Sequence, residues 1–298
     1  MKITIITPSF NSANYIERAI LSVLDQDYDN FEHIIMDNCS TDGTLEILKK
    51  YSHLRWKSEK DKGQSDAMNK GFELSTGDII VYLNCDDYFL PNAFNQVIPL
   101  FEKGSKFVVG NVLLQLEDGR EFTIKPNVTY KKMLKHWEHA AFPNNPVQYF
   151  YRREVQEKFP FNTNNKKTMD LEFLCDAASH YKFEKIDYTL GVYPLLEGAV
   201  SVEAQKDPFY WTFETFSFLD KHLLSYEQNE ILSFKKEQQK AYLERSIQAI
   251  SQNQTYSKTN EYLCKDMKQL VSVSFFKNPF KKYQYYKQAI KSFSRTGC

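Results

Sequence analysis

The segment that decides the fold is "KITIITPSFNSANYIERAILSVLDQDYDNFEHIIMD", residues 2–37. Its two ends, "KITIIT" and "EHIIMD", are short runs rich in β-branched side chains, which is typical of strands. Between them Ile16, Ala19, Ile20 and Val23 recur at the spacing of one helix face. A strand, a helix and a second strand joined by short loops predict a parallel strand pair with a crossover helix.

The same alternation continues beyond this segment. We expect further strands at "LRWKS" (54–58) and "DIIVYL" (78–83), and further helices at "TDGTLEILKKY" (41–51) and "SDAMNKGFELS" (65–75). Asn14, followed by Glu17 three residues later, resembles an N-terminal cap for the first helix. The predicted fold class is therefore α/β, with a mostly parallel, Rossmann-like, doubly wound sheet.

The composition changes after Pro208. Between residues 209 and 278 the chain contains neither Gly nor Pro, and helix formers occur throughout. We therefore divide the chain into an α/β domain over 1–204 and a helical C-terminal region over 205–298. No acidic residue follows Asp266, and residues 268–295 interleave lysines with aromatic rings.

Bulk composition excludes several classes of protein. Lys plus Arg and Asp plus Glu number 38 each, so the net charge gives no indication of nucleic-acid binding.

The amino terminus enters a strand without a signal-peptide layout, and no apolar run approaches the ~18 residues of a membrane-spanning helix. The cysteines lack paired spacing and predict reduced thiols in a cytoplasmic protein; they are Cys39, Cys85, Cys175, Cys264 and Cys298.

Three loops at the expected carboxyl ends of the strands share a polar character. They are "TPSFN" (7–11), "MDNCSTDGT" (36–44) and "NCDD" (84–87). Ligands of open α/β sheets bind at this edge. Together the loops predict a site for a polyhydroxylated, phosphorylated ligand.

Asp86 and Asp87 follow an apolar run directly, where two adjacent carboxylates repel each other. They fit a hard divalent cation, Mg²⁺ or Mn²⁺, which takes oxygen ligands and keeps positions for substrate phosphates. Such a cation also offsets the charge of a departing diphosphate. The alternative is an N-cap pair, because Pro91 opens a helix nearby. The other two loops favour the cation site.

The loop "SEKDKGQSDAMNKG" (58–71) precedes a helix, whose amino end attracts phosphates. An ordinary capped surface helix explains this loop equally well, because it lacks P-loop spacing. Gly63 and Gly71 allow a tight turn and close helix packing.

A further carboxylate comes from the expected helix "KKTMDLEFLCDAASHY" (166–181). At 100° per residue, Asp170 falls inside the apolar stripe, while Glu172 and Asp176 lie on the opposite face. Partial burial would raise the pKa of Asp170 toward the range of a general base. A first-turn partner of the helix dipole is the open alternative.

Other motifs carry weaker signals. His136 and His139 in "HWEH" lack a third metal ligand and favour an exposed helix face. No Ser-His-Asp or Cys-His arrangement is supported. The basic aromatic segment 268–295 suits an anionic membrane surface, which we favour, although its rings could instead pack on the α/β domain.

Residues 1–110 resemble glycosyltransferase family 2, the inverting nucleotide-sugar enzymes of the GT-A fold, and especially the bacterial branch that builds capsule, O-antigen or exopolysaccharide. The matching pieces, in the order of the family, are "TPSFN..NYIERAILSVLDQ", "FEHIIMDNCSTDGTLEIL", "SEKDKGQSDAMNKGFELSTGDII" and "YLNCDD". The resemblance continues more loosely through "NNPVQYFYRREV" (144–155) and "FNTNNKKTMDLEFL" (161–174). It implies a nucleotide-sugar half over 1–110 and an acceptor half over 111–204.

The resemblance also implies roles for individual residues. The carboxylates expected to act on the sugar donor and acceptor are Asp86 and Asp87 in the metal-binding D-x-D region and Asp170 as the catalytic base. The residues expected to bind the nucleotide are Thr7, Pro8, Phe10 with its ring on the base, Asn11, Asp37, Asp66 and Asn84.

Some positions depart from the family pattern. Asn84 replaces the first Asp of D-x-D, and Met169 stands where many members carry Glu. The segment "YPLLEGAVS" (193–201) lacks the Arg or His that often precedes Ser there. These departures leave the third protein ligand of the cation open.

The sequence thus predicts an inverting glycosyltransferase with a UDP-sugar donor, an Mn²⁺ or Mg²⁺ cofactor and a saccharide or lipid-linked acceptor. It would be cytoplasmic and attached to the inner face of the plasma membrane. Two alternatives are a sugar-1-phosphate nucleotidyltransferase, which requires a Gly-rich basic loop that "TPSFNSAN" lacks, and a non-catalytic Mg²⁺-binding receiver-like module.

Overall fold

The computed structural model describes residues 1–134, 141–196 and 221–222. The chain divides into two compact units, Met1–Val202 and Glu203–Cys298. The expected helical region 205–298, its basic segment 268–295 and the motif "HWEH" lie outside the described residues, apart from 221–222, and so stay predictions. Among the described residues, no helix combines the length and the apolar character required to cross a bilayer.

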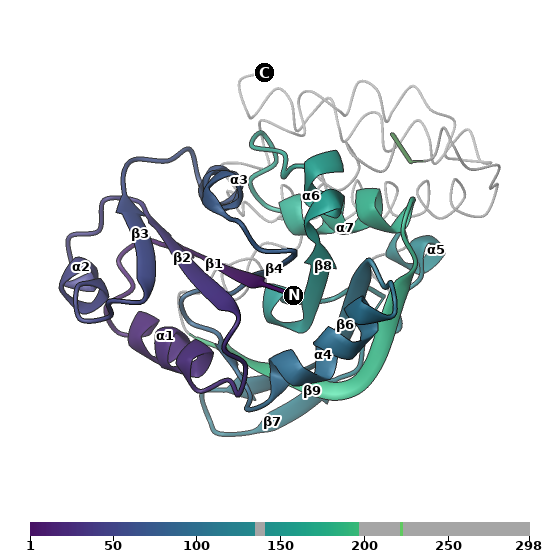
Figure 1. The fold of residues 1–298 in the computed structure, drawn as a ribbon, viewed down its shortest axis with the longest axis horizontal. Coiled ribbons are helices and arrows are strands. Elements are labelled where there is room, and N and C mark those ends of the chain that lie inside the picture. The colour runs from purple at the N-terminus through teal and green to yellow at the C-terminus, as the bar shows by residue number, and fades with distance from the viewer. Residues whose placement is uncertain (135–140, 197–220, 223–298) are drawn as a thin grey trace, which may run out of the picture. The chain divides into compact units, whose positions relative to one another are not determined.

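The strands of the described residues form one nine-stranded sheet in the order β3-β2-β1-β4-β8-β6-β9-β5, with β7 paired to β6 (Figure 1). Their bounds are β1 Ile3–Ser9, β2 Phe31–Asp37, β3 Leu54–Ser58, β4 Ile79–Tyr82, β5 Tyr88–Phe89, β6 Phe107–Leu116, β7 Glu121–Ile124, β8 Tyr149–Arg152 and β9 Phe183–Leu195. Strands β1 to β4 pair in parallel, as expected.

Beyond β4 the sheet is mixed. Strand β8 runs antiparallel to both β4 and β6, whereas β6 and β9 run parallel to each other. Gly110 lies at a register shift in β6, and a Cβ there would come within 2.6 Å of the Leu190 side chain. The α/β class is confirmed, and the fully doubly wound arrangement holds only for the half that contains β1 to β4.

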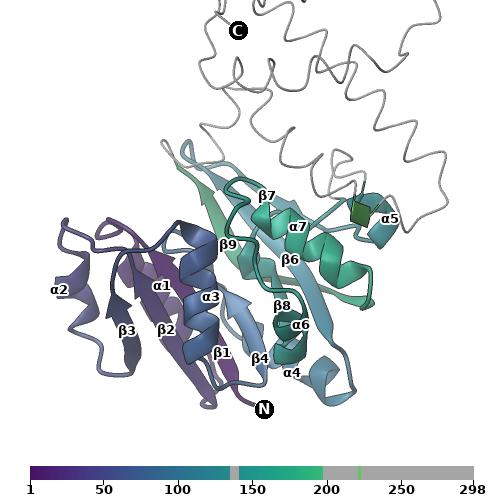
Figure 2. The same cartoon turned by 90° about the horizontal axis from the view of Figure 1, so that it is seen from above.

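Helices cover both faces of the sheet. Their bounds are α1 Ile16–Leu24, α2 Thr44–Leu48, α3 Gln64–Leu74, α4 Ala93–Glu102, α5 Tyr130–Met133, α6 Arg153–Lys158 and α7 Met169–Ala178, with a 3₁₀ turn η1 at Pro146–Gln148. Helices α1 and α4 lie on one face, and α3, α6 and α7 lie on the other (Figures 1 and 2). Helix α7, which carries Asp170, therefore lies on the same face as α3.

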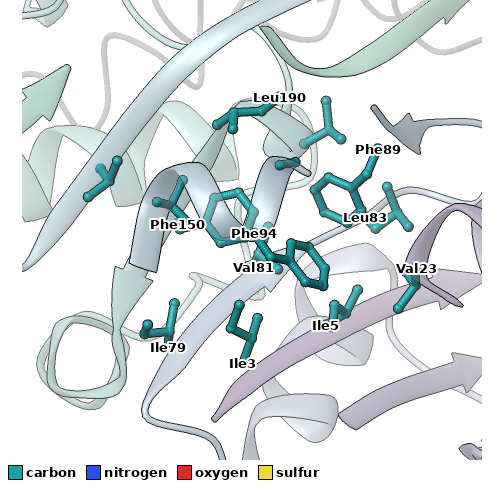
Figure 3. Close-up of a cluster of buried hydrophobic side chains, with 14 of the residues drawn as sticks. Ile3, Ile5, Val23, Ile79, Val81, Leu83, Phe89, Phe94, Phe150 and Leu190 are labelled. Atoms are coloured by element: carbon teal, nitrogen blue, oxygen red, sulfur yellow. The ribbon is translucent and has the colours of Figure 1, made fainter. Parts of the chain in front are cut away.

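Alternating strand residues produce the two cores. Ile3 and Ile5 of β1 pack with Phe94 of α4 and Phe150 of β8 on the face covered by α1 and α4 (Figure 3). On the other face, Ile6 lies so close to Gly71 of α3 that an added Cβ would approach it to 2.5 Å. This alternation fixes the strand register, because a slip of one residue would exchange the two faces.

The predicted cap of α1 is wrong. The helix begins at Ile16, its N-cap is Tyr15, and no side chain caps it. Glu17 instead accepts hydrogen bonds from Tyr51 Oη at 2.9 Å and Lys50 Nζ at 3.4 Å. The Glu17 carboxylate, which the predicted cap would have used, is thus engaged by two residues that follow α2.

Candidate active site at the ends of strands β1 to β4

The loops that follow β1, β2, β3 and β4 are hydrogen-bonded to one another. Asn11 N donates to Ser40 Oγ at 2.7 Å, which joins the first two loops. Ser12 Oγ lies 3.0 Å from Cys85 Sγ, and Asp61 N donates to Asn38 Oδ1 at 3.0 Å. The predicted polar loops therefore meet at one edge of the sheet, because parallel strands end on the same side.

The first loop presents two of its four predicted nucleotide-binding side chains to solvent. Phe10 is 59% exposed, and Asn11 is exposed in the left-handed region with φ of 48°. Pro8 is half-buried. Thr7 is fully buried, and its hydroxyl lies 2.9 Å from Nε2 of His33 in the neighbouring strand β2. Thr7 therefore anchors the start of the loop to β2, whereas the side chains of Phe10 and Asn11 are accessible to a ligand.

Asp37 at the end of β2 organises the second loop. Its Oδ2 atom accepts hydrogen bonds from Ser40 N at 2.9 Å and Ser58 Oγ at 2.7 Å. Ser40 Oγ also donates to Oδ1, and the residue is almost fully buried. The carboxylate thus holds the loop after β2 against the end of β3.

The acidic turn after β4 is built around Asp87, whose side chain is 1% exposed. Its Oδ2 atom accepts hydrogen bonds from Asn84 Nδ2 and Asn145 Nδ2, each at 2.8 Å. Its Oδ1 atom is buried and has no hydrogen-bond partner among the described residues. A buried carboxylate oxygen without a partner is costly, so this atom is a candidate ligand atom.

Electrostatics distinguish this turn from an ordinary loop. Burial raises the pKa of Asp86 and raises that of Asp87 further, and the charge of Asp86 adds to the effect on Asp87. Arg18 of α1 opposes both shifts and donates to the backbone oxygen of Asp86 at 2.8 Å. The alternative interpretation as a helix cap is wrong, because α4 begins at Ala93 and its N-cap is Asn92.

The residues present fit a hard divalent cation. Asp86 and Asp87 supply two carboxylates, and Oδ1 of Asp87 provides an acceptor that no group in the part of the chain that the structure describes uses. The described residues contain no cluster of three His, Cys, Asp or Glu side chains that could hold a metal ion. Mg²⁺ and Mn²⁺ sites of this type commonly use one or two carboxylates together with water and substrate phosphates.

The loop before α3 is tied to the acidic turn. Gln64 Nε2 donates to Asn84 Oδ1 at 3.0 Å. Asp66 Oδ2 accepts from Lys62 N at 2.9 Å and Lys70 Nζ at 3.2 Å. The Lys62 backbone N–H is the main cause of the lowered pKa of Asp66. Asp66 therefore shapes the loop, whereas Gln64, which the sequence did not single out, links it to Asn84.

Asp170 lies in the first turn of α7 and is partly buried between Met169 and Leu171. Burial raises its pKa, although the N–H of Leu171, 2.8 Å from Oδ1, partly opposes the shift. Thr168 is the N-cap, and Glu172 is held by Asn162 and Asn165. The pKa shifts in the predicted direction. Asp170 is half-buried, as Glu172 and Asp176 are, and its place in the first turn also fits the alternative of a partner for the helix dipole, so its role as a base stays a prediction.

The segment before α7 is clamped to α3. Asn69 donates from Nδ2 to Phe161 O at 2.8 Å and accepts from Phe161 N at 3.1 Å. Lys166 Nζ donates to Lys62 O, and Ser65 Oγ lies 3.5 Å from Asn165 O. These contacts fix the start of the Asp170 helix relative to the loop that precedes α3.

The parallel half-sheet, its acidic turn after β4 and the mixed second half define a GT-A nucleotide-sugar transferase fold. The structure of Staphylococcus aureus TarS 1-349 in complex with UDP-GlcNAc superposes with a TM-score of 0.63 at 17% identity, covering 99% of this chain and 90% of that one. The mannosyltransferase PcManGT from Pyrobaculum calidifontis, solved with GDP-Man and Mn²⁺, gives a TM-score of 0.53 at 15% identity, covering 99% and 86%.

The chain belongs to glycosyl transferase family 2, whose family model matches residues 4–186. A Bacillus subtilis protein provisionally assigned as the teichuronic acid biosynthesis glycosyltransferase TuaG is 33% identical over 45% of this chain and 57% of its own. The Escherichia coli UDP-Glc:alpha-D-GlcNAc-diphosphoundecaprenol beta-1,3-glucosyltransferase WfgD is 31% identical over 45% and 55%. The matched region thus spans little more than half the length of these relatives.

Proposed function

We propose that this protein is an inverting glycosyltransferase that moves a sugar from a UDP-sugar to a hydroxyl group of a saccharide or lipid-linked acceptor in bacterial surface-polysaccharide synthesis. The observation that carries the proposal is the acidic turn after β4, where Asp87 Oδ1 lies beside Asp86, buried and without a partner in the described part of the chain. Family membership and the glucosyltransferase activity for which the Escherichia coli relative WfgD is named support it. Neither alternative considered from the sequence, a nucleotidyltransferase or a receiver-like module, belongs to this family.

The proposed donor site combines the rim loops with the acidic turn. Asp86 and Asp87 would hold Mn²⁺ or Mg²⁺, which supplies charge stabilisation for a diphosphate leaving group. The exposed ring of Phe10 would stack on the nucleobase, and Asn11 and Asn84 would offer amide hydrogen bonds. Asp37 and Asp66, whose carboxylates already hold backbone N–H groups, would keep the surrounding loops in a binding-competent shape.

Asp170 is the proposed general base. It would accept the proton of the acceptor hydroxyl while that oxygen bonds to the anomeric carbon and the bond from this carbon to the diphosphate oxygen breaks. A single displacement of this type inverts the anomeric configuration. The raised pKa of Asp170 suits this task, because a base is most effective when its pKa approaches the working pH.

We further propose that the protein works in the cytoplasm at the inner face of the plasma membrane, through the basic aromatic segment 268–295. The absence of acidic residues after Asp266 supports this. Sedimentation with vesicles tests it: binding to vesicles with phosphatidylglycerol, but not to neutral ones, is expected. Equal recovery with both vesicle types would contradict it.

A donor screen tests the main proposal. Purified protein with Mn²⁺ would be incubated with UDP-, GDP- and dTDP-sugars, and release of the nucleoside diphosphate would be measured. We expect release from a UDP-sugar and none after EDTA treatment. Asp170→Asn should bind UDP as wild type does but lose transfer, whereas the control Asp176→Asn on the same helix should retain it. Full turnover by Asp170→Asn would refute the base assignment.

A further inference from the structure

Asn145 lies in the segment between β7 and β8, far along the chain from the acidic turn. Its Nδ2 atom nevertheless donates to Asp87 Oδ2 at 2.8 Å, and its side chain is almost fully buried. It is the second of two amides on the same carboxylate oxygen, the other being Asn84 from the turn itself. Two amide N–H groups therefore hold Oδ2 of Asp87, one from the turn itself and one from the segment before β8.

The orientation of the Asn145 amide is fixed by its own backbone neighbours. Its Oδ1 atom accepts a hydrogen bond from Val147 N at 2.8 Å, so the Nδ2 atom must face Asp87. Gln148 completes a capping box by accepting from Asn145 N, and its own amide donates to Gly110 O of β6 at 3.2 Å. The amide thus has a single consistent assignment and a rigid support.

Two donors on Oδ2 determine which oxygen of Asp87 remains available. Oδ2 accepts two hydrogen bonds, whereas Oδ1 is buried and has no partner within residues 1–134, 141–196 and 221–222. Groups that hydrogen-bond a ligating carboxylate fix its orientation, and their loss commonly costs 10–100-fold in metal affinity. The Asn84 amide comes from the same turn as Asp87 and is only half-buried, so it fixes the carboxylate less firmly than the buried Asn145 amide from a separate segment.

We infer that Asn145 is a positioning residue for the proposed cation–diphosphate site: it fixes the Asp87 carboxylate so that Oδ1 faces the ligand. The inference rests on the proposed function. It means that the region beyond residue 110, which the sequence resemblance assigns to the acceptor, completes the donor site. The η1 turn then connects the site to β6 through Gln148 and Gly110.

The test separates this role from the capping role of the same side chain. Asn145→Ser keeps a good N-cap acceptor for Val147 N but is too short to reach Asp87. Asn144→Ser, at the exposed neighbouring position, is the matched control. Mn²⁺ affinity would be measured at saturating UDP from the paramagnetic resonance of free Mn²⁺, together with the melting temperature without metal.

We expect the Kd for Mn²⁺ to rise at least about 10-fold in Asn145→Ser and to stay unchanged in Asn144→Ser. The melting temperatures of both variants without metal should stay close to that of wild type. Wild-type affinity in Asn145→Ser would overturn the inference and leave the proposed function intact. A wild-type protein that binds no Mn²⁺ with UDP would overturn both.

Asn145→Thr serves if the serine variant does not fold, because threonine also caps and fills more of the space. The same rise in Kd is then expected. Failure of both variants to fold would assign Asn145 to the cap alone and overturn the inference.

Discussion

The guanidinium carbon of Arg18 lies 4.4 Å from the centroid of the Tyr88 ring, and the same group donates to the backbone oxygen of Asp86. Arg18 therefore spans the acidic turn from α1 to β5. It is a cation next to two carboxylates that burial already disfavours. The turn is therefore contacted by a fixed charge from α1 and by the Asn145 amide from the segment before β8.

Arg18→Gln should weaken both the turn and ligand binding. Loss of the cation–π contact and of a charge-assisted hydrogen bond is expected to cost about 1 kcal/mol of folding free energy. For a domain of this size that corresponds to a melting temperature lower by about 2–4 °C. Lys49→Gln, which removes an exposed helix-surface charge, should shift it by less. Calorimetry with and without Mn²⁺ and UDP measures both effects, and identical melting temperatures would contradict the bracing role.

The sequence predicted the parallel half-sheet and the helix around Asp170 correctly, because both depend on local periodicity. The apolar runs of β1 to β4 and the helical spacing around Asp170 are visible in single segments. Asn145 could not be found in this way, since its meaning depends on β8 pairing beside β4. The role of Arg18 could not be predicted either, because its contacts with Asp86 and Tyr88 join segments that are far apart in the sequence.

Two tertiary effects also changed local predictions. The Thr7 hydroxyl, expected at the nucleotide, lies 2.9 Å from Nε2 of buried His33 in the neighbouring strand β2. Glu17, expected as a cap, is taken by Tyr51 from a neighbouring element. For Glu17 a contact between distant segments replaced the local cap that the sequence suggested, and for Thr7 a contact between neighbouring strands engages the hydroxyl.

The pH dependence of transfer should report the state of Asp170. Burial raises its pKa above the ordinary value of 3.8, so the carboxylate is protonated at a higher pH than a free aspartate. We expect kcat to fall as the pH decreases through this raised pKa, while UDP binding declines less over the same range. A kcat that remains constant down to pH 4 would contradict the role of Asp170 as base.

Asp170→Asn should also be as stable as wild type at neutral pH, or more stable. A carboxyl group whose pKa is raised by folding adds stability at low pH and loses that contribution as pH rises through the folded-state pKa. Asparagine carries no charge and avoids this loss. Thermal melts at pH 4 and pH 7.5 should therefore show a larger advantage for the variant at pH 7.5. A large destabilisation at pH 7.5 would indicate that the ionised form is held by contacts of a structural kind.

His33 should make the fold sensitive to mild acid. Burial, and then the neighbouring His53, lower the pKa of His33 to about 3, whereas in the unfolded chain it titrates near 6.5. The unfolded state therefore binds a proton that the folded state does not, and stability falls as pH drops below about 6.5. The slope reaches at most ~1.4 kcal/mol per pH unit.

His33→Gln should flatten this acid limb between pH 6.5 and 5, because glutamine keeps a hydrogen-bonding group near Thr7 but does not titrate. Urea unfolding at a series of pH values measures the slope. Exposed His180→Gln is the control and should retain the wild-type slope. Equal slopes in wild type and His33→Gln would assign the acid sensitivity to other groups.

Gly71→Ala should destabilise the protein although alanine favours helices. An added Cβ would lie 2.5 Å from Ile6 Cγ2 and 3.3 Å from Met36 Cγ, so α3 must move away from β1 and β2. Overpacking of this kind costs about 1–3 kcal/mol, which exceeds the roughly 1 kcal/mol gained from helix propensity. The displacement also draws Gln64 away from Asn84, and therefore UDP affinity should fall as well.

Glu73→Ala, on the exposed side of the same helix, should change stability by less than about 0.5 kcal/mol. Urea unfolding together with UDP titration tests both effects, and an unchanged midpoint in Gly71→Ala would mean that α3 shifts on the sheet without cost.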